Sequence, residues 1–177
     1  MWSAGREPNV GYNSSEAARE PSADPDPFRP PQVLSPAREE LIRRTIESVR
    51  DAKNVIFHMY NAAAPMFRDQ VFQNTKQQTV DLAVKHVKLV RSLVDEAIAR
   101  GDRTKWQFEY SPEAFSQTEP DFAVEICTAV QDAWFAGRNK KEELPIIFNL
   151  PATVEVATPN NYADQVRVSW ARGVGKR

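Results

Sequence analysis

Cysteine, histidine and long apolar runs are all scarce in this sequence of 177 residues, which has one cysteine and two histidines. The single cysteine, Cys127, rules out an internal disulfide and fits a reducing compartment. No apolar run approaches the about 18 residues that a membrane span needs, so no membrane segment is predicted. Residues 1–13 also lack the apolar run of a secretory signal. These absences predict a soluble intracellular protein, with cytoplasm and mitochondrion both left open.

An excess of charge of one sign is lacking as well. The 23 basic and 24 acidic side chains leave a net charge of −1, and no basic stripe with interleaved aromatics occurs. Nucleic acid is therefore not an expected partner. The sequence also has no glycine-rich phosphate loop and neither Cys-x-x-Cys nor His-x-His spacing, so no local motif predicts a metal ligand.

Residues 1–31 differ in composition from the rest of the chain. They are polar and broken by prolines, which predicts a disordered leader with little to bury. From Gln32 onward, short apolar runs alternate with amphipathic segments, and strands are predicted at 32–34, 54–60, 105–110 and 144–150. Helices are predicted to begin at Ser35-Pro36, Thr75, Thr118 and Thr158-Pro159.

The alternation of strand and helix without hairpin turns predicts parallel βαβ units. The clearest element is the helix predicted over 75–99, where valines recur at spacings of three and four before Gly101. Four strands of this kind fit either a small doubly wound sheet or part of a closed (β/α)8 barrel, which needs about 200–250 residues when complete. The pattern alone leaves both architectures open.

Polar side chains gather at the carboxyl ends of these strands, where α/β folds place their sites. Because side chains alternate along a strand, His58 and Tyr60 are expected on one face. By the same reasoning, residues near the ends of the next two strands are expected to line one shared opening of the fold. They are Glu109, Ser111, Glu113, Asn149, Pro151 and Thr153.

Each of these residues also has an ordinary structural interpretation. A single histidine at a strand end, such as His58, is more often a satisfied structural group than a catalyst, and Asn149 could simply cap its strand. Glu109 is expected to be a partnered interior carboxylate rather than a reactive one. His86 is expected on the surface of its helix, and Cys127 is expected to be a packing residue.

The sequence at these strand ends resembles the 2-isopropylmalate synthase family. The matching stretches are QVL (32–34), FHMYN (57–61), WQFEYSPE (106–113), IIFNLPATVE (146–155) and TPNNYAD (158–164). Their order and spacing resemble barrel strands three to six of that family, over residues 32–166. The resemblance implies an α/β fold that is a partial (β/α)8 TIM barrel, with 167–177 as a tail outside the family pattern.

The resemblance implies an acyltransferase that condenses acetyl-CoA with 2-oxoisovalerate in leucine biosynthesis, with a divalent metal (Mg²⁺, Mn²⁺ or Zn²⁺) as cofactor. By resemblance, Glu113 would be the catalytic residue that assists proton transfer or orients water. Thr153 would bind the carboxylate of the oxo acid, and Leu34 would touch its branched tail. The remaining residues expected to line the pocket are His58, Tyr60, Ser111, Asn149 and Pro151.

The sequence departs from the family where the metal would bind. The family's Asp-Arg-Asp/Glu-Gly motif on the first strand and its His-Pro-His-Asn-Asp motif on the seventh do not occur. A truncated copy, inactive alone and prone to self-association through open barrel edges, is therefore expected. A duplicated synthase for a related 2-oxo acid in a specialised pathway and a non-catalytic remnant remain as alternatives.

Overall fold

A parallel sheet of four strands in the order β1-β2-β3-β4 runs through the computed structural model, which describes residues 30–50 and 52–175. The predicted leader, 1–31, lies almost wholly outside the described residues. The strands pair in chain order with no reversal, as consecutive strands of a barrel do, whereas a doubly wound sheet changes direction. Their bounds are Gln32–Pro36 (β1), Asn54–Ala62 (β2), Lys105–Glu113 (β3) and Ile147–Phe148 (β4).

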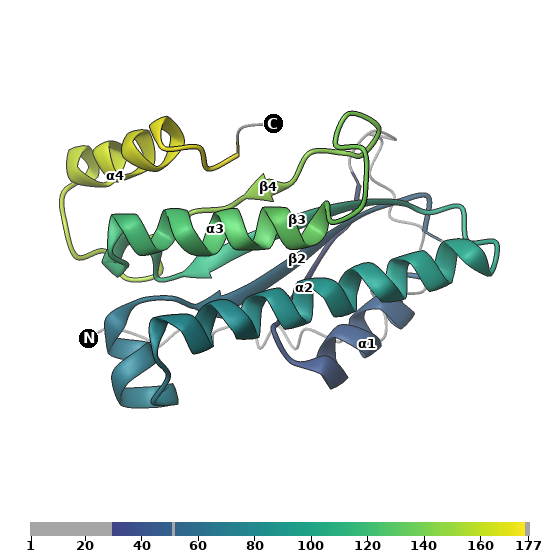
Figure 1. The fold of residues 1–177 in the computed structure, drawn as a ribbon, viewed down its shortest axis with the longest axis horizontal. Coiled ribbons are helices and arrows are strands. Elements are labelled where there is room, and N and C mark those ends of the chain that lie inside the picture. The colour runs from purple at the N-terminus through teal and green to yellow at the C-terminus, as the bar shows by residue number, and fades with distance from the viewer. Residues whose placement is uncertain (1–29, 51, 176–177) are drawn as a thin grey trace, which may run out of the picture.

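Helices α1, α2 and α3 cover one face of this sheet (Figure 1). Helix α2 packs against both α1 and α3, and α4 packs against α3. The bounds are Glu39–Ser48 (α1), Lys76–Ala99 (α2), Pro120–Trp134 (α3) and Pro159–Ala171 (α4), with a π-helical segment at Phe67–Phe72 and a 3-10 turn at Phe115–Gln117. Helix α4 therefore continues five residues beyond Val166 into the predicted tail. No helix of the described residues is both long and apolar enough to cross a bilayer.

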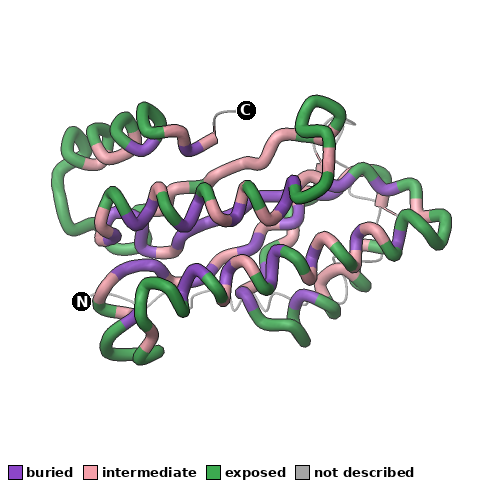
Figure 2. The backbone as a smooth tube through the Cα atoms, in the orientation of Figure 1, coloured by how far each residue is buried: buried purple, intermediate pink, exposed green. Residues whose placement is uncertain are grey.

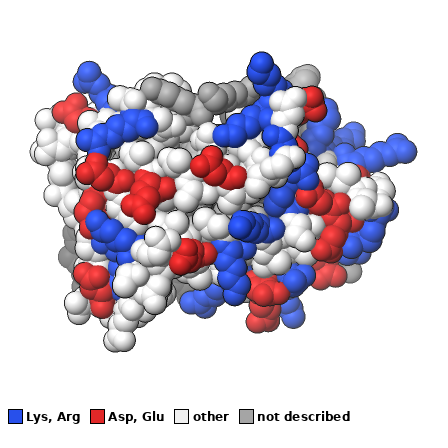
Figure 3. Space-filling view, viewed as in Figure 1, with Lys and Arg blue, Asp and Glu red and all other residues white. Residues whose placement is uncertain are grey.

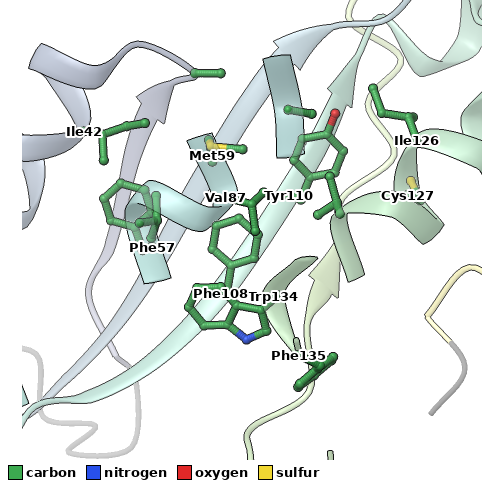
Figure 4. Packing of buried hydrophobic residues seen from close by; sticks show 14 of the residues in the cluster. Ile42, Phe57, Met59, Val87, Phe108, Tyr110, Ile126, Cys127, Trp134 and Phe135 are labelled. Atoms are coloured by element: carbon green, nitrogen blue, oxygen red, sulfur yellow. The ribbon is translucent and has the colours of Figure 1, made fainter. Parts of the chain in front are cut away.

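The core lies between the sheet and these helices. Odd-numbered positions of β2 and even-numbered positions of β3 are buried there, and the buried tube segments of Figure 2 follow this layer. Phe108 stacks on Trp134 with ring centroids 4.5 Å apart, and Figure 4 shows this pair among its neighbours. Cys127 is fully buried, as predicted for a packing residue, and burial raises the pKa of its thiol.

Charges of both signs intermix on the face of the molecule that the helices form (Figure 3). Arg91 of α2 pairs with Asp95 one turn further on (2.9 Å) and with Glu143 (3.1 Å). Arg138 also pairs with Glu143, at 3.0 Å. Arg138 also pairs with Asp95 of α2, at 2.5 Å, so the basic residues at positions 138, 140 and 141 are partly ion-paired to α2.

Two predicted helix starts are wrong. Ser35 and Pro36 belong to β1, because the next residue continues the sheet: the Ala37 amide donates to the Tyr60 carbonyl oxygen at 2.9 Å. Helix α1 begins only at Glu39. Thr118 does not cap α3, whose N-cap is Glu119; the Thr118 hydroxyl donates instead to the Ala114 carbonyl oxygen at 3.0 Å.

The predicted surface position of His86 is also wrong. His86 is buried in α2, and its Nδ1 lies 2.8 Å from the Leu82 carbonyl oxygen. Because α2 is flanked by helices on two sides, its buried arc is wider than its apolar stripe. Strand β4 is shorter than the predicted 144–150, and Pro145 and Pro151, which flank it, have no amide hydrogen to donate to a ladder.

Candidate functional site

One face of the sheet is turned away from the helices, and the predicted site residues lie on it. The burial of β2 alternates, with Val55, Phe57 and Met59 fully buried and the positions between them only partly so. His58 lies opposite Leu34 on β1 and opposite Glu109 on β3. Leu34 is 59% exposed, so this open face is not covered by α1 to α3.

A network of polar side chains crosses the open face. Gln32 Nε2 donates to Glu109 Oε2 at 2.8 Å and lies 3.0 Å from His58 Nδ1. On the other side of its ring, His58 Nε2 lies 2.7 Å from Ser111 Oγ. Asn149 Nδ2 donates to the same Ser111 oxygen at 2.8 Å. The network thus joins β1, β2, β3 and the segment that follows β4.

His58 is partly buried and Glu109 is buried, and this changes the acid–base behaviour of both side chains. Burial lowers the pKa of His58 and raises the pKa of Glu109, because each loses water that would stabilise its charged form. Their closest atoms, His58 Nδ1 and Glu109 Oε1, are 3.5 Å apart, which by itself would favour an ion pair. The Gln32 amide placed against the same Nδ1 favours a neutral ring, in agreement with the lowered pKa. Glu109 is a partnered carboxylate, as predicted.

Three further predicted residues lie where the chain leaves β3 and β4. Glu113 ends β3 and is half-buried, and its carbonyl oxygen accepts from the Ala63 amide at 3.1 Å. The next amide, that of Ala114, donates to Thr153 Oγ1 at 3.0 Å. Pro151 is held by its carbonyl oxygen, which accepts from the Ser116 amide at 3.4 Å. Hydrogen bonds therefore join the segments that follow β3 and β4, at the carboxyl ends of the strands.

The structure therefore brings His58, Ser111 and Asn149 together by hydrogen bonds, and Thr153 beside the backbone that follows Glu113. Leu34 and Tyr60 share the face by register, with Tyr60 opposite Ser111. Gln32 was not predicted as a site residue. Its signal was its position two residues before Leu34, which puts both side chains on the same face of β1.

The described residues do not suit a divalent metal. They contain no group of three or more His, Cys, Asp or Glu side chains placed to hold an ion. His58 and Glu109 are neighbours, but His86 is buried in α2 against the Leu82 carbonyl oxygen, and Cys127 is buried in the core. A catalytic metal generally takes three protein ligands, so such ligands would have to come from other residues.

Comparison with known proteins assigns the family. The profile described as HMGL-like matches residues 8–172. The chain belongs to the HMGL-like family. The matched range begins before Gln32 and ends after Val166, so it is wider than the resemblance at the strand ends. It also confirms the predicted fold class, an α/β chain that carries part of a TIM-barrel domain.

Three similar proteins share the name 2-isopropylmalate synthase. The chain is 54% identical over 134 residues to a 2-isopropylmalate synthase of Schizosaccharomyces pombe, covering 76% of this chain and 22% of that protein. It is 50% identical over 135 residues to that of Ralstonia pickettii (76% and 22%), and 52% identical over 147 residues to that of Pseudomonas entomophila (82% and 25%). The predicted family is confirmed, and the chain spans between about a fifth and a quarter of these relatives.

Proposed function

We propose that this chain carries the part of a 2-isopropylmalate synthase-type acyltransferase that binds the 2-oxo acid. The observation that carries the proposal is the hydrogen-bonded cluster of His58, Ser111 and Asn149 on adjacent strands, near the strand ends where (β/α)8 enzymes bind substrates. The names of the relatives support the same reaction class. The substrates would be acetyl-CoA and 2-oxoisovalerate, in leucine biosynthesis.

In the proposed reaction the methyl carbon of acetyl-CoA loses a proton and bonds to the ketone carbon of the oxo acid. The ketone oxygen takes up a proton, and water then releases CoA from the thioester. Glu113 would be the catalytic residue that moves a proton or orients that water. Glu113 is half-buried at the end of β3, and the hydrogen bond of the next amide, that of Ala114, holds the main chain that carries its carboxylate.

The other proposed roles concern binding. Thr153 Oγ1 accepts the Ala114 amide hydrogen, so its own hydroxyl proton is available to the carboxylate of the oxo acid. Leu34, exposed on the open face, would contact the branched tail. Tyr60 and Pro151 would form the walls of the oxo-acid pocket beside Ser111 and Thr153.

Members of this family generally use a divalent metal, and the described residues do not provide its ligands. No step of the proposal is therefore assigned to a metal held by this chain. A polypeptide of these 177 residues alone is expected to release no CoA from acetyl-CoA and 2-oxoisovalerate above background.

A chimera tests the proposal. The 134 aligned residues of the Schizosaccharomyces pombe relative would be replaced by those of this chain, and CoA release would be followed with a thiol reagent. Glu113→Gln is expected to lower kcat at least about a hundredfold, which is the usual contribution of one acid–base group. The matched control is Glu125→Gln, which removes an exposed carboxylate on α3 and should leave kcat unchanged.

Thr153→Ala separates binding from chemistry in the same chimera. It should raise KM for the oxo acid about tenfold with little change in kcat, because it removes one hydrogen bond to a charged group. Thr153→Ser keeps the hydroxyl and should restore KM. A chimera that folds but releases no CoA would contradict the proposed function and favour a non-catalytic remnant. Turnover of another 2-oxo acid in preference to 2-oxoisovalerate would contradict the proposed substrate.

A further inference from the structure

The network on the open face restricts where its protons can lie. Gln32 Nε2 carries two hydrogens and has two neighbours, Glu109 Oε2 at 2.8 Å and His58 Nδ1 at 3.0 Å. A carboxylate oxygen only accepts, so the amide nitrogen is the atom that faces it. The second amide hydrogen then points at His58 Nδ1, which can receive it only if that nitrogen has no proton.

The protonation of the other ring nitrogen, His58 Nε2, follows from this. A neutral ring without a proton on Nδ1 carries it on Nε2, so His58 donates to Ser111 Oγ over 2.7 Å. Asn149 Nδ2 also donates to this oxygen, at 2.8 Å. Two donated hydrogen bonds occupy both lone pairs of the Ser111 hydroxyl, so its own proton has to be donated outside the network.

We propose that Gln32 and Glu109 are positioning residues that hold His58 in the Nε2–H tautomer and thereby make the Ser111 hydroxyl a donor to an oxygen atom of the bound ligand. The assignment of that oxygen to the 2-oxo acid rests on the proposed function. The tautomer itself rests on the distances within the network and on an ionised Glu109 carboxylate.

Around His58 Nδ1, a second arrangement of Gln32 and Glu109 satisfies the same distances. With a protonated Glu109 and the Gln32 amide turned over, the Gln32 oxygen would accept from Glu109 and from His58 Nδ1–H. His58 Nε2 would then accept the Ser111 proton, and none would remain for a ligand. The two arrangements predict opposite tautomers for His58, so the tautomer decides between them.

Nitrogen NMR of the histidine rings measures this directly, since the chain has only two histidines. Magic-angle spinning spectra of the 177-residue chain with ¹⁵N-histidine can be recorded whether the chain is monomeric or self-associated. His86 is an internal reference: its Nδ1 faces the Leu82 carbonyl oxygen and has to carry the proton. At pH 7.5 the expected result is Nε2–H for His58 and Nδ1–H for His86, with His86→Gln to assign the signals. An Nδ1–H tautomer at His58 would overturn the proposal.

Substitution of Gln32 tests its positioning role. In Gln32→Ala, His58 Nδ1 would face only Glu109 Oε1, 3.5 Å away, and Nε2–H is expected to give way to a ring protonated at Nδ1. Gln107→Ala is the matched control, because Gln107 lies on the same face and donates to the Pro145 carbonyl oxygen outside the network. An unchanged His86 signal shows that the variant is folded. A His58 that keeps Nε2–H in Gln32→Ala would overturn the role of Gln32.

Kinetics in the synthase chimera separate this inference from the proposed function. Gln32→Ala should raise KM for the oxo acid about tenfold, equivalent to about 1.4 kcal/mol, and leave kcat unchanged. An active chimera whose KM does not respond would overturn the inference and leave the function standing. An inactive chimera would contradict the function, while an Nε2–H His58 would still support the tautomer assignment.

Discussion

At the scale of single residues, Arg68 is a cation almost removed from water. It is 5% exposed, and its guanidinium donates to both carboxylate oxygens of Glu119, at 3.0 and 2.8 Å, and to the Ala63 carbonyl oxygen. It also lies over the ring of Phe122, 4.7 Å from the centroid. Glu119 is the N-cap residue of α3, so this pair attaches the loop that follows β2 to the start of that helix.

Glu119→Gln should destabilise the chain. The Arg68 guanidinium, bonded to the Glu119 carboxylate, lowers the pKa of that carboxyl to about 2. Because the Glu119 side chain is 38% exposed, solvent screening reduces the stabilisation that the ion pair with Arg68 provides. We therefore expect the substitution to lower the free energy of unfolding by about 1 to 2 kcal/mol at pH 7. Urea denaturation measures it, and Glu125→Gln on the same helix is the control.

The effect of pH on this pair has a definite sign. The folded pKa lies below the unfolded value of 4.5, so the stabilisation is fully present above pH 4.5 and is lost as the pH falls toward 2. The difference between the chain and Glu119→Gln should therefore shrink between pH 4.5 and 2. Equal stability of the two proteins at pH 7 would contradict the account of Arg68.

Residue-level predictions from the sequence succeeded where strand geometry alone decides. The period of two puts His58 and Tyr60 on one face whatever surrounds them. The link from Gln32 to Glu109 could not be predicted, because it reaches from β1 past β2 to β3 and so depends on the register between strands. Arg68 was missed for a similar reason, since its partner Glu119 lies 51 residues away.

At the scale of elements, α2 is the helix that local sequence specifies most completely. Thr75 Oγ1 accepts from the Gln78 amide at 3.1 Å, and Gln78 Oε1 accepts from the Thr75 amide at 2.8 Å, forming a capping box. Its apolar positions meet the sheet and both flanking helices. Such local signals made its start and end predictable.

Thr75→Ala should lower the free energy of unfolding by about 1 kcal/mol, the usual cost of losing an N-cap oxygen. The matched control is Thr128→Ala at an exposed position inside α3, where alanine is the better helix former and stability should not fall. Thermal or urea unfolding followed by circular dichroism gives both values. A Thr75→Ala chain as stable as the Thr128→Ala chain would show that the box contributes nothing.

Two other element boundaries depended on hydrogen bonds that compete with the local helix-start pattern. The sequence Ser35-Pro36 has the local pattern of a helix start, but pairing of the following residue with Tyr60 keeps the chain extended. Thr118 has the pattern of an N-cap, but its hydroxyl is bonded to Ala114. At Ser35-Pro36 a long-range backbone hydrogen bond overrode the local preference, and at Thr118 a competing hydrogen bond within the preceding turn did so.

At the scale of the whole molecule, the described sheet has helices on one face and polar side chains on the other. Parallel sheets are normally covered on both faces, and unpaired edge strands bind other chains. We therefore propose that a polypeptide of these 177 residues self-associates through the open face and the edges of β1 and β4. Light scattering or sedimentation should detect species larger than a monomer. A monodisperse monomer with a cooperative thermal transition would contradict this.

The most direct measurement for the central proposal is CoA release by the chimera of the Schizosaccharomyces pombe relative that carries this chain's aligned residues. If the chain carries a working oxo-acid pocket, kcat/KM for 2-oxoisovalerate should lie within about tenfold of the parent enzyme, a difference of at most about 1.4 kcal/mol in transition-state binding. A folded chimera with bound metal that releases no CoA in the presence of 2-oxoisovalerate would contradict it.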